Sequence, residues 1–306
     1  MTKKMNLQLF GDGYNQKLPA RDYQLEFKKL LKAVFAVQAY FADFFGGDIE
    51  AIDGVQENET AFYVKTSDIP VVVGTAYSKD ANTAFGTGTG KSSRFGNRTE
   101  IIYKDTPAKY SGEYVFHEGI DRHTVNNDFD AAVADRLELQ ARAKTATFNV
   151  AHGKFISASA GKTIAGGASI TKDNVADVFN QLSKHFVNVG AIGTKVAKVT
   201  ADVYNAIVDS GLSTTAKNAD VNVADNEARK FKGFLIEEVP DSLFQTNEVI
   251  YAYIAGIGKA FTGIETARTI ESEDFDGVAL QGAGKFGEFI LPDNKQAVAK
   301  ITVTGA

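Results

Sequence analysis

The chain has no cysteine among its 306 residues. This absence excludes disulfide bonds, thiol catalysis and metal sites held by cysteine. No stretch approaches the roughly 20 consecutive apolar residues that a membrane-spanning helix needs. The start, MTKKMNLQLFGDG, places too few apolar residues before Gly11 to form the core of a secretory signal peptide. We therefore expect a protein without a membrane partner, kept in the cytosol until it assembles.

Complete catalytic motifs are also lacking. GTGTGKS, from Gly86 to Ser92, resembles a phosphate-binding loop, but Phe85 stands where that motif needs its first glycine. SAGKT, which begins at Ser159, has Ile156 at the corresponding position. No Gly-x-Ser-x-Gly nucleophile motif occurs. The sequence thus predicts no catalytic residue, no cofactor and no enzyme, although a phosphate-binding enzyme stays as an alternative.

Histidine is scarce, with four residues in the whole chain. His117 and His123 lie near Glu118 and Asp121, and such a group could in principle hold a metal ion. Isolated histidines at a strand end and a turn are more often structural or exposed. We therefore predict no metal site, and keep a metal-dependent enzyme only as the alternative.

The overall composition, 44% hydrophobic and 23% charged, is typical of a soluble globular protein, and the length suggests about two domains. The net charge of −5 conceals an asymmetry, because residues 1–32 carry a net +4. This basic segment is either a solvated surface or an arm that lies against an acidic neighbouring subunit or nucleic acid.

The longest helical pattern runs from Asn126 to Ser157. No glycine or proline occurs between Gly119 and Gly153, so one continuous helix is allowed. Asn126 or Asn127 can cap its start and Gly153 can end it. Its expected apolar stripe consists of Phe129, Val133, Leu137, Ala141, Phe148, Ala151 and Phe155. The pattern predicts a structural spine about 37 Å long from Asp128 to His152.

Before the spine, residues 1–20 read as an irregular arm and Asp22–Phe45 as an amphipathic helix. Two β-prone stretches, Phe62–Ser67 and Ile69–Val73, then precede a long glycine-rich loop from Gly74 to Arg98. The segments 99–103 and 113–117 that follow the loop are β-prone as well. The loop has four basic residues against one acidic residue, and a loop this long usually has a function. We predict a projecting hairpin that binds a partner.

After the spine, helices are expected over Thr171–Phe186 and Ala201–Ser210, and strands over 197–200, 234–239 and 249–257. This alternation indicates an α/β subdomain over residues 169–262. The stretches 264–270, 288–291 and 297–303 are again β-prone. Between them lies an acidic run made of Glu271, Glu273, Asp274 and Asp276. The run lacks EF-hand ligand spacing, so we interpret it as a solvated or partner-facing strand.

One block has a distinctive resemblance. His117–Lys154, HEGIDRHTVNNDFDAAVADRLELQARAKTATFNVAHGK, resembles the strand-to-spine junction of major capsid proteins from tailed phages of Gram-positive bacteria. MNLQLFG, from Met5 to Gly11, is similar to their usual first residues. FKGFLIEEVPDSLF, from Phe231 to Phe244, resembles the strand that precedes an apolar strand in these proteins.

The resemblance implies an α+β protein with the Hong Kong 97-type capsid fold. Gly74–Arg98 would be the tip of an extended E-loop and Asn127–Ser157 the spine of a P-domain. The implied division is an N-terminal arm and helix (1–60), an E-loop hairpin with flanking strands (61–118), a P-domain spine (119–168), an A-domain (169–262), and returning P-domain strands with a C-terminal strand (263–306).

The same resemblance implies a major capsid protein that assembles, in the host cytoplasm, into the icosahedral shell of a virion. The implied partners are copies of the same chain in hexamers and pentamers, a separate scaffolding protein, a portal protein, and double-stranded DNA enclosed without sequence-specific binding. The alternative is a shell subunit of a bacterial nanocompartment with the same fold.

The residues also suggest where neighbouring subunits meet. The loop Gly74–Arg98 is basic, and the run Glu271–Asp276 is acidic. We therefore expect the loop of one subunit to overlie the acidic run of its neighbour. The candidate inter-subunit residues are Lys91, Arg94, Arg98, Glu271, Glu273, Asp274 and Asp276.

Overall fold

The computed structural model describes residues 38–47, 49–52, 60–67, 69, 71, 73–74, 77–79, 93–96, 98–125, 129–210, 221–222, 227–228 and 230–305. The basic N-terminal segment, the phosphate-loop-like Gly86–Ser92 and the expected helix caps Asn126 and Asn127 lie outside these residues. Among the described helices, none is both long enough and apolar enough to cross a membrane.

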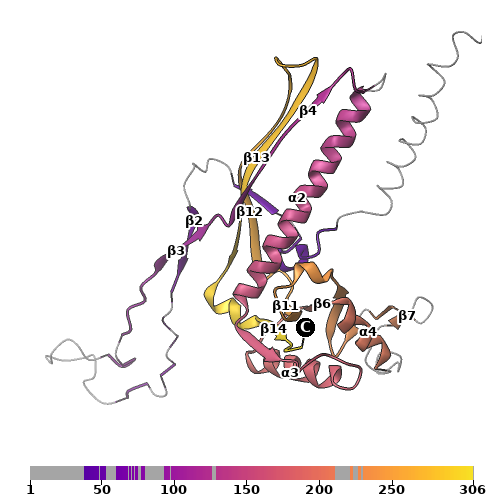
Figure 1. The fold of residues 1–306 in the computed structure, drawn as a ribbon. Helices are drawn as coiled ribbons and strands as arrows, with labels where there is room; N and C mark the ends of the chain where they lie inside the picture. The colour runs from indigo at the N-terminus through magenta and orange to yellow at the C-terminus, as the bar shows by residue number, and fades with distance from the viewer. Residues whose placement is uncertain are drawn as a thin grey trace, which may run out of the picture.

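A long helix and a long sheet form the upper part of the molecule in Figure 1. The helix is α2, Phe129–Ser159. The sheet has the order β1–β12–β13–β4, with β1 parallel to β12 and the other pairs antiparallel. Its strands are β1 (Ile49–Ile52), β12 (Gly258–Glu271), β13 (Gly277–Ile290) and β4 (Gly112–Asp121). Strands far apart in sequence are therefore joined along the side of α2.

Helix α2 confirms the predicted spine but not its end. Gly153 does not stop the helix, which continues to Ser159. Its buried residues all lie in the C-terminal half: Phe148, Asn149, His152, Gly153, Ile156, Ser157 and Ser159. From Phe129 to Thr147 no side chain is buried, so the first half of the expected apolar stripe is exposed or half-buried. The helix is thus packed firmly at one end only.

A six-stranded sheet forms the lower part of the molecule, with the order β5–β14–β11–β6–β10–β9. Its strands are β5 (Lys162–Ala165), β14 (Val298–Thr302), β11 (Glu248–Ile254), β6 (Lys195–Val199), β10 (Phe234–Glu238) and β9 (Lys230–Phe231). The predicted helices are present as α3 (Val175–Asn188) and α4 (Ala201–Asp209), and their apolar faces pack into the core of this sheet. Six of the seven residues of β11 are buried, as its continuous apolar pattern predicts.

Residues 38–47 plug the junction between the two sheets. They were predicted to end a long helix, but they form a turn and the short 3₁₀ helix η2, Ala42–Phe45. Phe41, Phe44 and Phe45 are buried in a cluster with Ile156 of α2. The side chain of Asn149 accepts a hydrogen bond from the Tyr40 N–H at 3.1 Å and donates one to the Gln38 carbonyl at 2.7 Å.

The projecting arm begins with the antiparallel pair β2 (Thr60–Thr66) and β3 (Lys104–Lys109). Phe62 of β2 contacts the rings of Phe261 and Phe289. Phe289 and Glu288 are neighbours in β13, so their side chains face opposite sides of the sheet. Glu288 contacts His152 of α2. The arm therefore packs on the sheet face opposite α2. The strand predicted at 99–103 is wrong in position, because β3 starts at Lys104, and the described residues of 69–73 form no strand.

The remaining elements are the short pair β7 (Val221–Asn222) and β8 (Glu227–Ala228), and the 3₁₀ helices η3 (Asp241–Leu243) and η4 (Pro292–Ala297). The last strand, β14, lies in the six-stranded sheet between β5 and β11. Strand β12 runs continuously across positions 262 and 263, where the division expected from the sequence places the boundary between the A-domain and the returning P-domain strands. Strand β13 is much longer than the β-prone stretch at 288–291 indicates.

Candidate functional site

The acidic run forms a hairpin turn rather than the expected strand. It connects β12, which ends at Glu271, with β13, which starts at Gly277. The Ser272 N–H donates to the Gly277 carbonyl at 2.9 Å and closes the turn. A Cβ at position 277 would stand 2.0 Å from the carbonyl oxygen of Ile120, so only glycine fits there. The turn is consequently held against the end of β4.

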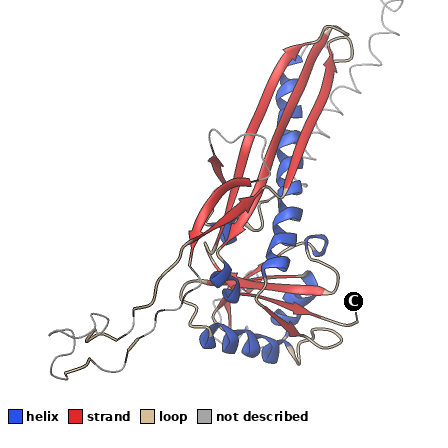
Figure 2. Cartoon of the chain, turned by 90° about the vertical axis from the view of Figure 1, so that its left-hand side faces the viewer, coloured by secondary structure: helices blue, strands red, loops and turns tan. Residues whose placement is uncertain are grey.

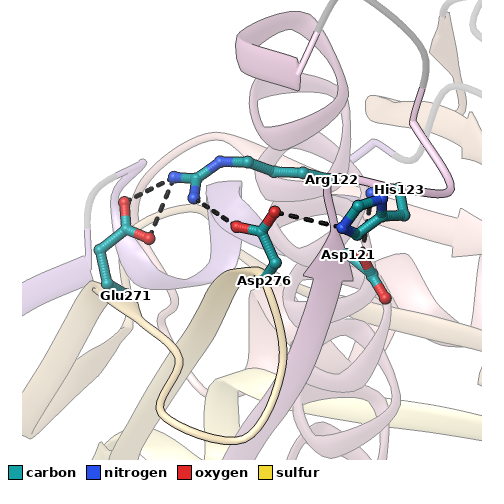
Figure 3. Close-up of polar contacts among 5 residues, drawn as sticks. All are labelled: Asp121, Arg122, His123, Glu271 and Asp276. Carbon is teal, nitrogen blue, oxygen red and sulfur yellow. Dashed lines mark hydrogen bonds and ion pairs between the residues drawn. The ribbon is translucent and has the colours of Figure 1, made fainter.

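Arg122, directly after β4, clamps both ends of this turn (Figure 3). Its backbone N–H donates to the Asp276 carbonyl at 2.8 Å. Its guanidinium donates to Glu271 at 2.7 and 3.0 Å and to the Asp276 carboxylate at 3.0 Å. The hydrogen bonds that Arg122 donates to Glu271 and then to Asp276 raise the pKa of Arg122 above its ordinary value. The same guanidinium lies 5.0 Å from the ring centroid of Phe129, which ties the turn to the start of α2.

His123 adds a contact that depends on protonation. Its Nε2 lies 3.4 Å from the Asp276 carboxylate, and its backbone N–H donates to Asp121 at 2.8 Å. Both side chains of the imidazole–carboxylate contact are exposed, so water competes for it. Arg122 stays charged whatever the state of His123, so the hydrogen bonds of Arg122 in Figure 3 are the ones that hold the shape of the turn.

Arg122 pairs with only two of the four acidic side chains. Glu273 and Asp274 are exposed at the tip, and no ion pair involves them within the described part of the chain. The tip therefore keeps two carboxylates that are available to a positively charged partner.

The predicted basic partners are not near this turn in the same chain. Arg94 and Arg98 belong to the projecting arm, and Lys91 lies outside the described residues. Figures 1 and 2 both show the arm and the β12–β13 turn pointing to different ends of the molecule. One chain therefore does not bring the basic and acidic candidates together.

Exposed ion pairs hold the first half of α2 to the sheet. Arg136 Nε donates to Glu118 at 2.7 Å, and Gln140 donates to the same carboxylate at 2.6 Å. The hydrogen bond from Arg136 lowers the pKa of Glu118. Glu265 forms an ion pair with Lys144 and accepts a hydrogen bond from the Tyr114 hydroxyl at 2.7 Å. The contact with Lys144 lowers the pKa of Glu265.

The residues considered for chemistry do not converge. His117 contacts Gln281 at 3.3 Å, whereas Glu118 binds Arg136 and His123 binds Asp276. In the described part of the chain, no group of three or more metal-ligating side chains is present. SAGKT runs from the end of α2 into β5, a helix-to-strand order opposite to that of a phosphate-binding loop.

Sequence reasoning missed the buried ionic groups at the junction of the two sheets. Lys198 is almost fully buried and pairs with Asp43 at 3.1 Å and with Glu237. Glu248 accepts hydrogen bonds from Ser157, Lys300 and Tyr251 at 2.9, 2.6 and 2.6 Å. These charges are spread along otherwise apolar strands, and only the tertiary structure pairs them. Arg122 was missed as well, because its partners Glu271 and Asp276 are distant in the sequence and only the tertiary structure brings them together.

No protein-family model matches the sequence, and no curated protein matches it. Solved structures do match. The structure titled Mycobacterium phage Che8 has a TM-score of 0.63 at 15% identity and covers 89% of this chain and 94% of its own. The capsid of the cyanophage P-SCSP1u has a TM-score of 0.66 at 10% identity, over 89% of this chain and 90% of its own.

The mature capsid of bacteriophage PhiM1 gives a TM-score of 0.64 at 11% identity, over 89% of both chains. The chain has the Hong Kong 97-type capsid fold. At sequence identities this low, the matches establish the fold alone. The Hong Kong 97-type fold predicted from the sequence is thus confirmed.

Proposed function

We propose that this chain is the major capsid protein of a tailed double-stranded DNA bacteriophage. The supporting observation is a fold shared over 89% of the chain with solved phage capsids. The structure also fits a shell subunit physically. It has an extended body, a projecting arm and an acidic turn at different ends, all suited to contacts between copies. Closed symmetry repeats each modest contact many times and so yields a stable particle.

We also propose the partners of the chain and the place where it assembles. Copies of the chain form hexamers and pentamers, a separate scaffolding protein and a portal protein take part, and assembly in the host cytoplasm produces a virion shell around double-stranded DNA. Within the chain, we propose that residues 61–118 form the E-loop with its flanking strands and residues 119–168 the P-domain spine. Residues 169–262 form the A-domain, residues 263–306 return to the P-domain and end in a C-terminal strand, and residues 1–60 form the arm and first helix.

The first experiment is to express the chain and examine it by electron microscopy and light scattering. Closed shells, or rings of five and six subunits, are the expected products. A monomer that stays monomeric with and without a co-expressed scaffolding partner would contradict the proposal. Particles isolated from their natural source should contain double-stranded DNA, whereas DNA-free particles with protein cargo would indicate a nanocompartment.

We further propose that the basic arm of one subunit meets the acidic turn of its neighbour. Because Arg122 already binds Glu271 and Asp276, the groups that remain for this contact are Glu273 and Asp274. Arg94, Arg98 and Lys91 are their partners from the arm. Each exposed pair contributes only about 0–1 kcal/mol, so the effect depends on repetition around the shell.

The test replaces Lys91, Arg94 and Arg98 with Ser. Assembly should be impaired while the circular dichroism spectrum and melting temperature of the free chain stay unchanged. Replacing Lys154, Lys162 and Lys184, which are exposed on other surfaces, provides a control of equal charge change. Normal particle yield from the first triple variant would contradict this contact.

A further inference from the structure

A buried lysine lies between two carboxylates at the junction of the two sheets. Lys198 of β6 is 1% exposed, and its ammonium contacts Asp43 of η2 at 3.1 Å and also contacts Glu237 of β10. One carboxylate is enough to balance the charge of a buried ammonium. The cluster therefore contains one acidic side chain more than charge balance needs.

The three side chains are brought together by different parts of the chain. Lys198 and Glu237 are direct partners in the parallel register of β6 and β10. Asp43 comes from the N-terminal part of the chain, where its carbonyl accepts the Gly256 N–H at 2.8 Å and the next residue, Phe44, is fully buried. Backbone and packing contacts thus hold Asp43 against Lys198 in addition to the ion pair.

Tyr253 of β11 completes the cluster. Its hydroxyl donates to Asp43 Oδ1 at 2.9 Å, and this is the oxygen that Lys198 contacts. Burial, and then the neighbouring Asp43 carboxylate, raises the pKa of Tyr253 well above its ordinary value, so the hydroxyl stays a donor. A donor fixed on a carboxyl oxygen stabilises the negative charge that grows there when a nucleophile attacks the carbon.

We propose that Lys198 and Asp43 form an intramolecular isopeptide bond, and that Glu237 transfers the protons. The Lys198 Nζ attacks the Asp43 Cγ, so that an N–C bond forms, the Cγ–Oδ2 bond breaks and Oδ2 leaves as water. Of the ammonium protons, one stays on the amide nitrogen and the others leave with the water. Glu237 accepts a proton from Nζ, passes it to the leaving oxygen and ends unchanged. The reaction needs no other reagent.

The surroundings favour the amide over the ion pair. Water around Lys198 has been removed, and a neutral amide does not carry the desolvation cost of a buried ammonium. The Asp43 side chain is 31% exposed, which leaves a path for the released water. Because the fold fixes both reacting groups in contact, the step resembles an intramolecular reaction with a high effective concentration.

A second lysine of the same sheet gives an internal comparison. Lys300 of β14 contacts Glu248 at 2.6 Å and the Ser157 hydroxyl at 3.1 Å. Tyr251 donates to the Glu248 carboxylate at 2.6 Å, so a polarising donor is present here too. Among the described residues, no second carboxylate pairs with Lys300. Lys300 has no group to transfer protons, so we expect it to stay in an ion pair.

The bond would have a clear consequence for the fold. Asp43 precedes helix α2 in the chain and Lys198 follows it, so the bond closes a covalent loop that contains the whole spine. Closing a long loop restricts the unfolded chain and thereby stabilises the folded one. The bond would also fasten η2 permanently at the junction of the two sheets. This inference concerns the single chain and does not depend on the proposed capsid function.

Mass spectrometry of the full chain, purified and then denatured, tests the bond directly. The intact mass should be lower than the sequence mass by one water molecule. Digestion should release a branched peptide that joins the segment with Asp43 to the segment with Lys198. An unchanged mass, both in fresh protein and after prolonged incubation, would overturn the proposal. Loss of water without a branched peptide would indicate a cyclic imide at an aspartate, and a branch at Lys300 would contradict the role of the second carboxylate.

Glu237→Gln tests the proton transfer, since it keeps the size of the side chain and removes its basicity. Bond formation should slow by roughly a hundredfold or more in this variant. Glu238→Gln is the matched control, because it makes the same charge change at the adjacent, exposed position of β10 and should form the bond at the normal rate. Circular dichroism shows whether each variant folds. A folded Glu237→Gln chain that forms the bond at the normal rate would overturn the role of Glu237; if that variant does not fold, the branched peptide of the unmodified chain decides.

Discussion

Gly153 of α2 lies directly under the backbone carbonyl of Leu243: a Cβ at residue 153 would stand 2.4 Å from that oxygen. The glycine that the sequence offers as a helix stop is therefore a close-approach point, where η3 touches the C-terminal part of a helix that continues past it. Gly153→Ala gains up to about 1 kcal/mol of helix propensity, but the overlap with Leu243 should cost about 1–3 kcal/mol.

We expect this variant to be destabilised in urea unfolding, with an unchanged slope of free energy against urea. Lys154→Ala is the control, since Lys154 is exposed on the next position of the same helix and its change should stay within about 0.5 kcal/mol. An equally stable Gly153→Ala variant would show that η3 moves away at no cost.

Acid should loosen the first half of α2 before it affects the second half. Arg136 lowers the pKa of Glu118, and Lys144 lowers the pKa of Glu265. A carboxyl group whose pKa is lower in the folded chain stabilises the fold above its unfolded pKa, and this contribution is lost as the pH falls through the folded pKa. Amides of residues 129–147 should therefore lose protection against hydrogen exchange, relative to those of residues 148–159, below the ordinary glutamate pKa of 4.5.

Glu118→Gln with Glu265→Gln should weaken that pH dependence, because both titrating groups are removed. Replacing the exposed Asp209, whose helix α4 packs in the other sheet, serves as the control. Unchanged acid sensitivity in the double variant would assign the effect to other carboxylates.

Glu248 should be among the most sensitive single positions for folding. It is buried and accepts hydrogen bonds from Ser157, Lys300 and Tyr251. Burial, and then the hydrogen bond with Glu248, raises the pKa of Tyr251, so its hydroxyl stays a donor. Glu248→Leu leaves the Lys300 ammonium without its partner and should cost about 3–5 kcal/mol in chemical denaturation.

The double variant Glu248→Leu with Lys300→Met should recover part of this loss, because no unpaired buried charge remains. Additive effects of the two substitutions would show that the charges do not act as a pair.

Much of the helical architecture could be predicted because its signal is local. Val175, Phe179 and Leu182 repeat at helical spacing, and the structure buries all three on one face of α3. The spine helix was predictable from its lack of glycine and proline over many turns. Its packing was not, because an alanine-rich helix has no dominant apolar face, and the structure buries only the half that begins at Phe148.

The candidate contact site was predictable only in composition. The acidic residues were visible in the sequence, but the turn that contains them depends on Gly277 meeting Ile120 and on Arg122 binding Glu271. These partners are separated by about 150 positions in the chain. A strand with mixed polar and apolar residues, such as β12, also has too weak a periodicity to reveal its length.

The sequence by itself determined the absence of cysteine chemistry, the spine, the amphipathic helices α3 and α4, and the buried strand β11. Helices α3 and α4 follow from a repeat of 3.6 residues, the spine from its lack of glycine and proline, and β11 from a continuous apolar run, and neighbouring positions express each of these signals without outside contacts. The tertiary structure decided the joining of β1, β12, β13 and β4 into one sheet, the close approach at Gly153 and the pairing of buried charges such as Lys198 with Asp43. These features depend on which distant segments meet, and a local pattern does not specify its partner.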